Sequence, residues 1–411
     1  MRIVYLSGSA GLGGAERCLL DLMECVGAER PTWSLALIAS GQGPLVDRAR
    51  ALGFSATVRP FPPALASLGD SAALGTGRSL ARVALRAAGA ARVIARYRGE
   101  LRAALRDSRP DVVHSNGYKT HLLGAWARPA GAALVWHLHD YVSNRPFMAR
   151  ALRWHASRCD AGIAVSESVG RDARAAWGPR LPLHVVLNGV NLDTFRPDGP
   201  RLDLDAIAGL PPSTEPVVRV GLVATLGRFK GHRIFLQAVA QLPRALKMRA
   251  YVVSGSVYET RGSEDSLDAL RALAAELGIA DRVGFTGFVP GPADAMRALD
   301  VVVHASTTPE PFGLVIVEGM ACGRPVIVSE AGGAAEIVRP EVDALTHAPG
   351  DVAGLAAAIR RLVTDVALRE RIANAGLQTA RSRFDRRRMA SEVVPIYEAL
   401  GRRGGPGNPA A

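Results

Sequence analysis

The sequence predicts an α/β protein of two doubly wound domains, each built around a parallel sheet. The first observation is an alternation of short apolar runs with longer stretches rich in Ala, Leu and Arg, which is typical of parallel strands connected by helices. The second is the length of 411 residues, which exceeds what one hydrophobic core usually serves. The third is a cluster of Asn, Gly, Asp and Pro over residues 188–216, where the alternation stops before it restarts. Two domains with a cleft between them are the simplest architecture.

The apolar runs fall into two series. The first series predicts strands at residues 2–6, 35–39, 111–114, 133–137, 162–165 and 184–187. The second series predicts strands at residues 217–224, 249–253, 282–285, 300–304 and 325–328. The intervening stretches predict helices, including an amphipathic helix over 15–25 and a final helix over 385–400. Residues 401–411 are rich in Gly, Pro and Arg, and we expect them to form a disordered tail.

The composition is that of a well-packed globular protein, with 48% apolar and 21% charged residues. The formal charge of +12 is unusual and comes mainly from Arg. It is consistent with binding to nucleic acid, with adsorption to anionic lipid, or with a bias of composition toward Arg and Ala. No DNA- or RNA-binding motif accompanies the charge, so nucleic acid is the weakest interpretation and is not an expected partner.

Cysteine usage and hydropathy indicate the compartment. The four cysteines form no C-x-x-C pair, so we expect buried thiols of a reducing compartment at Cys18, Cys25, Cys159 and Cys322. The N-terminus runs directly into a predicted strand, so we expect no signal peptide. No uninterrupted apolar run reaches the about 18 residues that a spanning helix needs. We therefore expect a cytoplasmic protein whose membrane contact is at most peripheral, on the inner face of the membrane.

Two carboxylates stand eight residues apart in the segment 308–328, the most informative stretch of the chain. Strand 300–304 precedes the segment and a predicted helix follows its Pro/Gly-containing turn, so Glu310 lies in the loop and Glu318 on the helix. In open α/β sheets, ligands bind beyond the carboxyl ends of the strands. An ionised carboxylate there suits sugar hydroxyls because it can only accept hydrogen bonds. The pattern favours a sugar-nucleotide site over the alternative of two solvated surface charges.

The segment from Pro309 to Ile327 reads P-E-P-F-G-L-V-I-V-E-G-M-A-C-G-R-P-V-I. It closely resembles the E-x7-E motif of retaining, family-4 type glycosyltransferases with the GT-B fold. The resemblance covers nearly the whole chain through four shorter motifs, which are G-G-A-E (Gly13 to Glu16), V-L-N-G-V-N-L-D-T-F-R-P (Val186 to Pro197), K-G-H (Lys230 to His232) and G-F-V (Gly287 to Val289).

The resemblance implies a domain organisation and roles for the motif. It implies two Rossmann-like domains facing across a cleft, with an acceptor-side domain over 1–190, a nucleotide-sugar-binding domain over 191–384, and the helix 385–400 crossing back to the first domain. In that family the second Glu, here Glu318, holds the ribose hydroxyls of the nucleotide. The resemblance places Glu310 and the turn that follows it toward the sugar and its phosphates; that turn is Phe312, Gly313 and Leu314.

A glycine-rich loop follows the first predicted strand, at residues 7–17, and leads into a helix. Glycines before a helix N-terminus allow the backbone to approach a phosphate or a sugar closely. The spacing is not G-x-G-x-x-G, and no P-loop motif occurs anywhere, so nicotinamide cofactors and P-loop ATP sites are disfavoured. We expect Gly13 and Gly14 to contact the donor diphosphate, although a purely structural turn would also account for the loop.

A second anion site should be basic, because a departing diphosphate accumulates negative charge that fixed cations stabilise without a metal. Lys230, in T-L-G-R-F-K-G-H, matches the diphosphate lysine of the resembled family. The usual arginine position of that family falls on Thr225, and the nearest arginine is Arg228. Either Arg228 replaces it from the loop, or one cation is missing.

Histidines cluster after the strand at 133–137. His137 and His139 share a face at period two, which is also how metal ligands are arranged. A metal hydrolase of the H-x-H-x-D-H type would need Asp and His where Tyr141 and Val142 stand, so that motif is absent and no metal site is expected. His139 is the closest match to the family histidine that points at the transferred sugar, whereas His137 fits a core or supporting position. Three weaker candidates for contact with acceptor or donor are His114, Asn116 and Lys119, and spacing leaves both partners open.

An arginine-rich stretch precedes these strands and has helical spacing over much of its length. Basic amphipathic helices adsorb to anionic bilayers, which would suit a lipid-linked acceptor. A solvated face on an Arg-rich protein explains the pattern equally well. The arginines are Arg78, Arg82, Arg86, Arg92, Arg96, Arg98, Arg102 and Arg106.

The sequence therefore predicts a retaining glycosyltransferase that needs no metal or other cofactor. It would transfer a hexose-type sugar from a nucleoside diphosphate sugar, with UDP as the expected nucleotide, to an acceptor hydroxyl of a glycan or lipid-linked acceptor in cell-envelope or exopolysaccharide synthesis. His139 and Glu310 would act at the sugar as the catalytic residues. The alternatives are a sugar-nucleotide epimerase or hydrolase on the same scaffold and a catalytically silent binding subunit.

Overall fold

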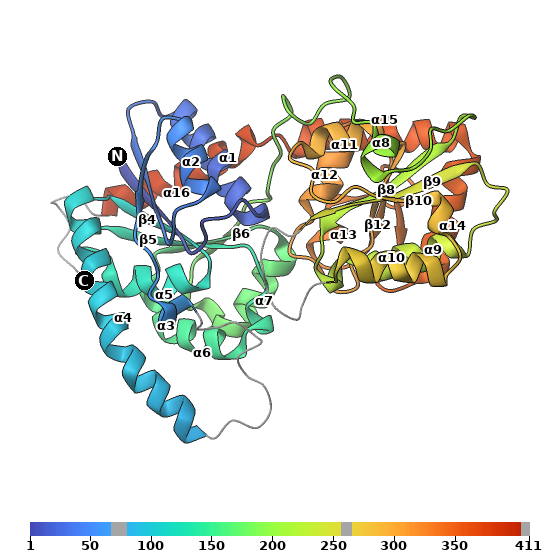
Figure 1. Cartoon of the computed structure of the whole chain (residues 1–411). Coiled ribbons are helices and arrows are strands. Elements are labelled where there is room, and N and C mark those ends of the chain that lie inside the picture. Colours follow the sequence, from blue (N-terminus) through green and yellow to red (C-terminus); the bar gives the residue numbers. More distant parts are fainter. Residues whose placement is uncertain (67–79, 256–264, 404–411) are drawn as a thin grey trace. The chain divides into compact units, whose positions relative to one another are not determined.

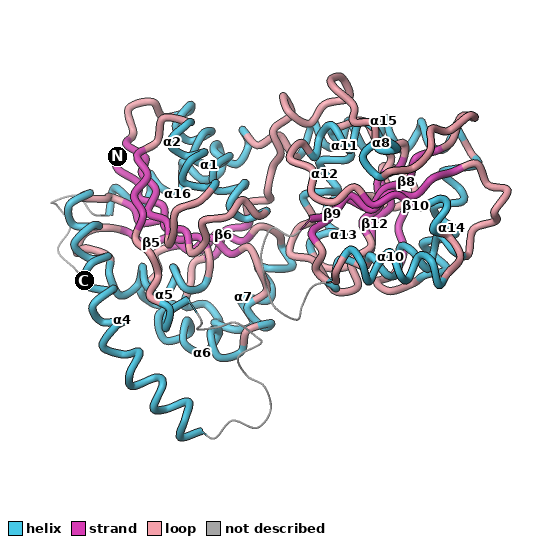
Figure 2. Tube along the Cα trace, viewed as in Figure 1, coloured by secondary structure: helices cyan, strands magenta, loops and turns pink. Residues whose placement is uncertain are grey.

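The computed structural model describes residues 1–66, 80–255 and 265–403 (Figure 1). These residues form two compact units, each with a central parallel sheet and helices on both of its faces (Figures 1 and 2). The first unit contains residues 1–187 together with the C-terminal segment that begins at Arg387, and the second contains 188–386. The predicted class of two doubly wound α/β sheets is confirmed.

The first unit has a seven-stranded parallel sheet in the order β3-β2-β1-β4-β5-β6-β7. Its strands are β1 (Arg2–Ser7), β2 (Ser34–Ala39), β3 (Ser55–Val58), β4 (Val112–Asn116), β5 (Ala133–Leu138), β6 (Ala161–Ala164) and β7 (Leu183–Val185). The strand order reverses direction between β1 and β4, whose last residues, Ser7 and Asn116, lie side by side. In doubly wound sheets this reversal point is where ligands bind, beyond the carboxyl ends of the strands.

Helices cover both faces of the first sheet (Figure 1). One face is covered by α1 (Gly14–Glu29), α2 (Pro44–Ala51) and α16 (Arg387–Arg403). The other face is covered by α3 (Pro63–Ala66), α4 (Leu80–Ser108), α5 (Tyr118–Ala127), α6 (Pro146–His155) and α7 (Glu167–Trp177). Short 3-10 turns are η2 (Val142–Asn144), η3 (Ala156–Arg158) and η4 (Gly178–Arg180). The core on the α1 side includes Tyr397 of α16, so this C-terminal helix is part of the first unit.

The second unit has a six-stranded parallel sheet in the order β10-β9-β8-β11-β12-β13. Its strands are β8 (Val218–Thr225), β9 (Met248–Gly255), β10 (Val283–Phe285), β11 (Val301–His304), β12 (Val326–Ser329) and β13 (Leu345–His347). Here the order reverses between β8 and β11, and the residues that follow these two strands include Lys230 and Glu310.

The helices of the second unit cover both faces of its sheet. One face of the sheet carries α9 (His232–Ala240), α10 (Leu267–Glu276) and α14 (Val352–Thr364), and the other carries α11 (Pro292–Ala298), α12 (Leu314–Ala321) and α15 (Val366–Arg383). One continuous apolar core lies between the sheet and the helices α9, α10 and α14. Shorter elements are η5 (Arg228–Lys230), η6 (Ala280–Arg282), α8 (Leu204–Ala208) and α13 (Gly333–Ile337).

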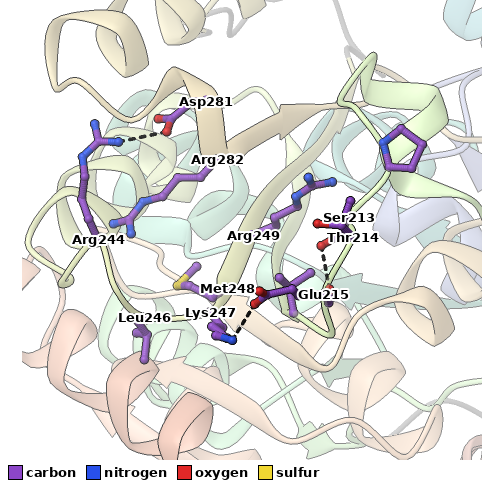
Figure 3. A pocket seen from close by; sticks show the side chains of 12 residues that line it. Ser213, Thr214, Glu215, Arg244, Leu246, Lys247, Met248, Arg249, Asp281 and Arg282 are labelled. Atoms are coloured by element: carbon purple, nitrogen blue, oxygen red, sulfur yellow. Dashed lines mark hydrogen bonds and ion pairs between the residues drawn. The ribbon is translucent and has the colours of Figure 1, made fainter.

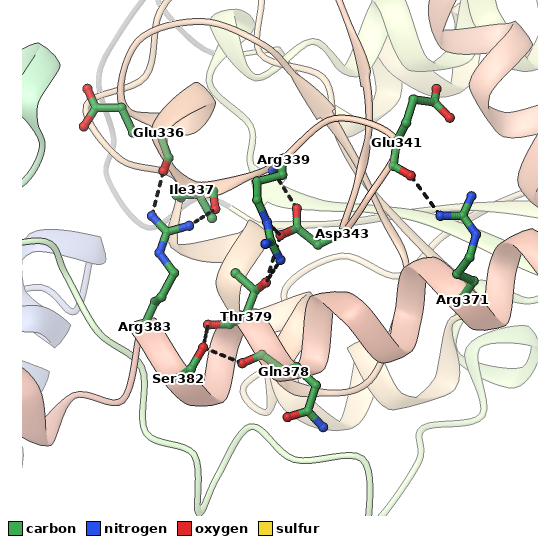
Figure 4. A network of polar contacts seen from close by, with 10 residues as sticks. All are labelled: Glu336, Ile337, Arg339, Glu341, Asp343, Arg371, Gln378, Thr379, Ser382 and Arg383. Atoms are coloured by element: carbon green, nitrogen blue, oxygen red, sulfur yellow. Dashed lines mark hydrogen bonds and ion pairs between the residues drawn. The ribbon is translucent and has the colours of Figure 1, made fainter.

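A polar network holds α15 against the loop that follows α13 (Figure 4). The Asp343 carboxylate is fully buried and accepts hydrogen bonds from Arg339 and from Thr379 of α15. Arg371 and Arg383 of α15 donate to backbone carbonyls of the same loop and of α13. A buried carboxylate is stable only with such partners, so this network has a structural role in fixing α15.

Two features bear on membrane contact. Among the helices of the described ranges, none is both long enough and apolar enough to span a bilayer. The arginine-rich stretch falls mostly on α4, where the exposed arginines include Arg92, Arg96 and Arg102. Arg78 lies outside the described residues, as do residues 404–411 of the expected tail.

Candidate functional site

The strongest candidate site lies at the reversal point of the second sheet. Glu310, in the loop after β11, is buried, and its Oε1 lies 2.5 Å from the Nζ atom of Lys230 in η5. Its backbone is also fixed, because the Gly333 amide donates to the Glu310 carbonyl at 2.7 Å. The structure thus brings together two residues that are 80 positions apart in the sequence and that the motifs had singled out separately.

Close packing of two backbone segments allows Lys230 to reach Glu310. Gly231, directly after Lys230, has φ +77, and a Cβ atom there would lie 1.8 Å from the Ala305 carbonyl oxygen. Only glycine tolerates both the conformation and the contact. The Thr307 amide then donates to the Phe229 carbonyl at 2.7 Å, which joins the η5 turn to the loop after β11.

His304 and Ser306 complete the surroundings of Glu310, and no sequence motif marks either residue as part of a site. The Ser306 hydroxyl donates to Glu310 Oε1 at 2.5 Å, and His304 Nε2 lies 3.4 Å from the same oxygen. Both residues are buried. The Ser306 carbonyl accepts a hydrogen bond from the Ser329 hydroxyl at the end of β12. One feature of the sequence could have identified His304 as a site residue: it ends the predicted strand that corresponds to β11, and β11 lies at the reversal point.

This environment keeps Glu310 ionised. Burial by itself raises the pKa of Glu310, but the Lys230 ammonium and the neighbouring His304 outweigh it and hold the pKa well below its usual range. The site therefore contains a fixed negative charge next to a cation, a combination that suits a ligand carrying both hydroxyl groups and phosphate.

Glu318 is a second buried carboxylate on the same segment, in the second turn of α12. The helix begins after Gly313, whose φ of +106 lies in the region that favours glycine. Phe312 is buried, and the centroid of its ring lies 5.9 Å from that of Phe384. Leu314 is the first residue of the helix. Carboxylates are rarely buried unless they are paired or part of a functional site. Because Glu310 and Glu318 are both buried, they are not solvated surface charges.

The cationic turn carries a second positive charge. Arg228 opens η5 and is exposed, whereas Lys230 closes it and is half-buried. Thr225 is the last residue of β8, and Arg228 follows it three residues later in the turn.

In the first unit, Gly13, Gly14 and Asn116 meet at the reversal point of the sheet. Gly13 is the N-cap of α1 and Gly14 is its first residue, so the first-turn amide groups of α1 have no helical partner. Asn116 ends β4, and its Nδ2 atom lies 3.4 Å from the Ala15 carbonyl. Its Oδ1 atom is buried with no hydrogen-bond partner among the described residues, a group that a ligand could satisfy. Lys119 lies half-buried in the first turn of the neighbouring helix α5.

Three histidines form a connected series at the ends of β4 and β5. The Tyr397 hydroxyl lies 2.7 Å from His114 Nδ1, His114 Nε2 lies 3.2 Å from His137 Nδ1, and the rings of His137 and His139 are 4.1 Å apart. His114 is fully buried with both ring nitrogens engaged, so it has no atom left for a ligand and instead supports His137. His139 stands at the end of the series and is only partly exposed, and its Nε2 atom is buried without a hydrogen-bond partner among the described residues.

Burial keeps these imidazoles neutral. It lowers the pKa of His139 to about 3, and burial together with the proximity of His139 lowers the pKa of His114 to about 3. It also lowers the pKa of His137 well below its usual range. A neutral His139 can donate or accept one hydrogen bond at a sugar hydroxyl. Within the described ranges, no group of three or more His, Cys, Asp or Glu side chains is arranged to hold a metal ion.

A surface hollow of the second unit does not coincide with this site (Figure 3). It lies at the amino ends of β8, β9 and β10, on the opposite edge of the sheet from Lys230 and Glu310. Its charged lining residues already have partners, as in the ion pairs Lys247–Glu215 and Arg244–Asp281. Ligands of parallel sheets bind at the carboxyl edge, so this hollow is not a candidate active site.

Comparisons with known proteins agree over both units of the chain. The family model "Glycosyltransferase Family 4" matches residues 12–194, and the model "Glycosyl transferases group 1" matches residues 212–379. The phosphatidyl-myo-inositol mannosyltransferase of Mycobacterium leprae is 31% identical over 303 residues, which cover 71% of this chain and 74% of that protein. The lipopolysaccharide core biosynthesis glycosyltransferase LpsD of Rhizobium meliloti is 35% identical over 210 residues, which cover 49% of this chain and 59% of LpsD. The chain thus spans little more than half the length of LpsD.

Among solved structures, HepE of Anabaena in complex with UDP-glucose is similar over 97% of this chain and 100% of that chain. The TM-score is 0.77 and the sequence identity is 26%. HepE has also been solved with UDP alone, and that structure gives a TM-score of 0.76.

Proposed function

Because the chain belongs to the group 1, family 4 glycosyltransferases, we propose that it transfers a hexose-type sugar from a nucleoside diphosphate sugar to an acceptor hydroxyl with retention of anomeric configuration. The observation that carries the proposal is the Lys230–Glu310 pair at the reversal point of a parallel sheet, followed in the chain by the buried Glu318 of α12. UDP is the proposed nucleotide, in keeping with the UDP and UDP-glucose complexes of HepE. The proposed setting is cell-envelope or exopolysaccharide synthesis, in keeping with the names of relatives such as LpsD.

In the second unit, each site residue has a proposed role in holding the donor. Lys230, with Arg228 from the same turn, binds the diphosphate and stabilises the charge that develops as it leaves. Glu318 accepts hydrogen bonds from the ribose hydroxyls, and Glu310 accepts them from the transferred sugar. The backbone of the turn at Phe312, Gly313 and Leu314 faces the phosphates.

In the first unit, the free amide groups at Gly13 and Gly14 bind the diphosphate. The neutral His139 hydrogen-bonds a sugar hydroxyl and orients the ring. Asn116 and Lys119 are the proposed contacts to the acceptor, and His114 acts only by supporting His137.

The proposed reaction requires no added base or metal. The bond between the anomeric carbon and the leaving phosphate oxygen breaks, and a bond from the acceptor oxygen forms on the same face of the sugar. The departing phosphate takes the proton of the acceptor hydroxyl, so no charged side chain must change its protonation state. Fixed cations at Lys230 and Arg228 stabilise the leaving group throughout.

A donor screen followed by a turnover assay tests the proposal. A ligand at about 100 times its dissociation constant raises the free energy of unfolding by roughly 2.7 kcal/mol, enough to rank UDP, GDP and ADP sugars by thermal shift. The preferred donor is then incubated with candidate acceptors and the products are followed by NMR. We expect a glycoside of retained configuration. Free sugar would instead indicate a hydrolase, an isomerised nucleotide sugar would indicate an epimerase, and binding without turnover would indicate a silent subunit.

A further inference from the structure

Helix α6 carries two large aromatic side chains that face solvent. Phe147 is 74% exposed and Trp154 is 78% exposed, which makes them the two most exposed large apolar side chains of the described ranges. They stand seven residues apart, two helical turns, and therefore lie on the same side of the helix. Leu152 and Ala156 point to the opposite side and are buried. The helix segment is therefore apolar on two sides, and only one of them is used by the fold.

The buried side already fixes the position of α6. The Trp177 indole of α7 donates to the Ala149 carbonyl at 3.1 Å, and the Trp126 indole of α5 donates to His155 Nε2 at 3.0 Å. These contacts, with the packing of Leu152, account for the attachment of the helix to its neighbours. Phe147 and Trp154 leave about three quarters of their surface outside these contacts, so their exposure calls for another explanation.

The exposed side of α6 is also positively charged. Residues 141–158 contain no Asp or Glu, and Arg150, Arg153 and Arg158 are exposed. Within the described part of the chain, none of these three arginines forms an ion pair with a carboxylate. We define the α6 face as Phe147, Arg150, Arg153, Trp154 and Arg158.

A neighbouring helix of the first unit, α4, also carries exposed positive charges. Helix α4 lies on the same side of the first sheet, and α5 packs between α4 and α6 (Figures 1 and 2). The exposed side chains of α4 include Arg92, Arg98 and Arg102, whereas Arg96 is paired with Glu100 at 2.9 Å. The aromatic side chains of the α6 face thus belong to a broadly basic side of the first unit.

We propose that the α6 face binds the surface of an anionic lipid bilayer. Aromatic side chains beside arginines are typical of helices that lie in the membrane interface, because the rings enter the acyl boundary while the guanidinium groups remain among the anionic headgroups. A protein partner would have to present both carboxylates for the arginines and apolar pockets for the two rings, whereas an anionic bilayer supplies headgroup charge and an apolar interior at any point of its surface.

The position of α6 in the chain links this surface to the acceptor. His139 ends the histidine series, and only the segment 140–145 separates it from the first residue of α6. Binding of the α6 face to a bilayer would hold the candidate acceptor-side residues close to the lipid surface. Resting on the proposed transferase function, this location assigns a lipid-linked acceptor rather than a freely soluble one.

Vesicle binding tests the surface without reference to turnover. The full chain is sedimented with vesicles of phosphatidylcholine alone and with vesicles containing phosphatidylglycerol, at low and at high salt. We expect binding only to the anionic vesicles, with release as salt rises. In Phe147→Ala/Trp154→Ala the partition coefficient should fall about a hundredfold, because each aromatic ring contributes about tenfold or more. In Arg150→Gln and in Arg153→Gln it should fall about fivefold each.

A matched control and a spectroscopic measurement sharpen the result. Ile207→Ala/Val366→Ala removes two apolar side chains of the second unit that are 45% and 52% exposed, and it should bind vesicles as the unchanged protein does. Tryptophan emission should shift to shorter wavelength on binding, and Trp154→Phe should abolish the shift while retaining most of the binding. Circular dichroism and UDP calorimetry verify that each variant is folded.

Several outcomes would overturn the proposal. One is absence of binding to anionic vesicles at low salt, and another is full binding by Phe147→Ala/Trp154→Ala. A third is self-association of the unchanged protein in sedimentation velocity that the double variant loses, since the α6 face would then join two copies of the chain. UDP binding and sugar transfer to a soluble acceptor analogue are measured separately, so failure of the proposed transferase function gives a different pattern from failure of the membrane surface.

Discussion

Lys230 and Glu310 form an ion pair at the reversal point of the second sheet, with Nζ 2.5 Å from Oε1. The carboxylate is buried, whereas the ammonium remains partly accessible to solvent. Because the ammonium is accessible, Lys230 can pair with Glu310 and also contact a ligand. Ser306 and His304 provide Glu310 with further stabilisation, so Lys230 can turn toward a diphosphate without leaving the carboxylate isolated.

The first prediction follows from this pair. Lys230→Met should weaken UDP binding by about tenfold to a hundredfold, since hydrogen bonds to charged groups contribute about 1.5–3 kcal/mol. It should also lower the free energy of unfolding by up to about 3 kcal/mol, because it leaves a buried carboxylate without its main cation. Calorimetry with UDP and urea denaturation measure the two effects.

A double variant and a control separate these effects. Lys230→Met/Glu310→Gln should regain much of the stability but not the UDP affinity, since the neutral amide no longer needs a cation. Lys247→Met removes an exposed lysine paired with Glu215 at the opposite edge of the same sheet, and it should change neither quantity appreciably. Equal UDP affinity in Lys230→Met and the unchanged protein would remove the diphosphate role of Lys230.

The second prediction concerns His304 as a positioning residue. His304→Phe retains the ring volume but removes the nitrogen that lies 3.4 Å from Glu310 Oε1. We expect kcat to fall by about tenfold or more while the dissociation constant for UDP stays within about twofold, because the imidazole orients Glu310 rather than touching the nucleotide. His304→Gln, which restores a side-chain donor, should recover part of kcat.

The exposed His184 provides the control, and His184→Gln should be unchanged in both parameters. A parallel loss of UDP affinity in His304→Phe would instead indicate that this histidine only maintains the fold of the loop after β11.

The fold was largely predictable from the sequence because buried parallel strands are continuous apolar runs. All eleven predicted runs correspond to strands of the structure, shifted by a few residues. The two strands that the sequence did not predict, β3 and β13, are edge strands. The sequence of β3, S-A-T-V, is half-exposed along its length, and β13 has only three residues, so neither produces a clear apolar run.

The site was predictable only where a motif marked it. Glu310, Glu318 and Lys230 were identified by resemblance, but the ion pair between Lys230 and Glu310 depends on the approach of Gly231 to Ala305, which no local pattern reveals. His304 was identified as a strand residue and not as a neighbour of Glu310. The burial of His114 depends on Tyr397, which lies 283 positions further along the chain, so its supporting role could not be inferred from spacing.

The third prediction concerns the ribose. Glu318→Ala should lower UDP affinity by tenfold or more, because hydrogen bonds to a charged acceptor contribute about 1.5–3 kcal/mol. Affinity for inorganic diphosphate, which has no ribose, should be unaffected. Calorimetry with both ligands measures the difference, and Glu276→Gln, at an exposed position of α10, is the control. Unchanged UDP binding in Glu318→Ala would mean that another group holds the ribose.

The fourth prediction addresses metal dependence. If His137 and His139 act as a supporting and an orienting residue, treatment with EDTA should leave UDP binding and transfer intact, since the fixed cations at Lys230 and Arg228 neutralise the diphosphate. Activity and calorimetry are compared before and after dialysis against the chelator. Loss of turnover that zinc or manganese restores would contradict the metal-independent scheme and would make the histidine pair candidate ligands.

The fifth prediction is a pH dependence of stability that originates in the first unit. Burial lowers the pKa of His114 and His139 to about 3, whereas a histidine of the unfolded chain has a pKa near 6.5. As pH falls below about 6.5, the unfolded chain binds protons that the folded chain does not, so the free energy of unfolding decreases. Each histidine contributes a slope approaching about 1.4 kcal/mol per pH unit, which ends near pH 3 where the folded state also protonates.

The measurement can be confined to this unit because all five tryptophans of the chain lie in it. Urea unfolding is followed by tryptophan fluorescence at pH 7.5, 6.5, 5.5 and 4.5. The free energy of unfolding should change little between pH 7.5 and 6.5 and should then decrease as the pH is lowered to 4.5. His139→Gln removes one titrating imidazole, so its slope should be shallower by about 1.4 kcal/mol per pH unit below pH 5.5. If the variant and the unchanged protein have the same slope, His139 titrates normally in the folded chain, and the neutral imidazole assigned to the sugar site is wrong.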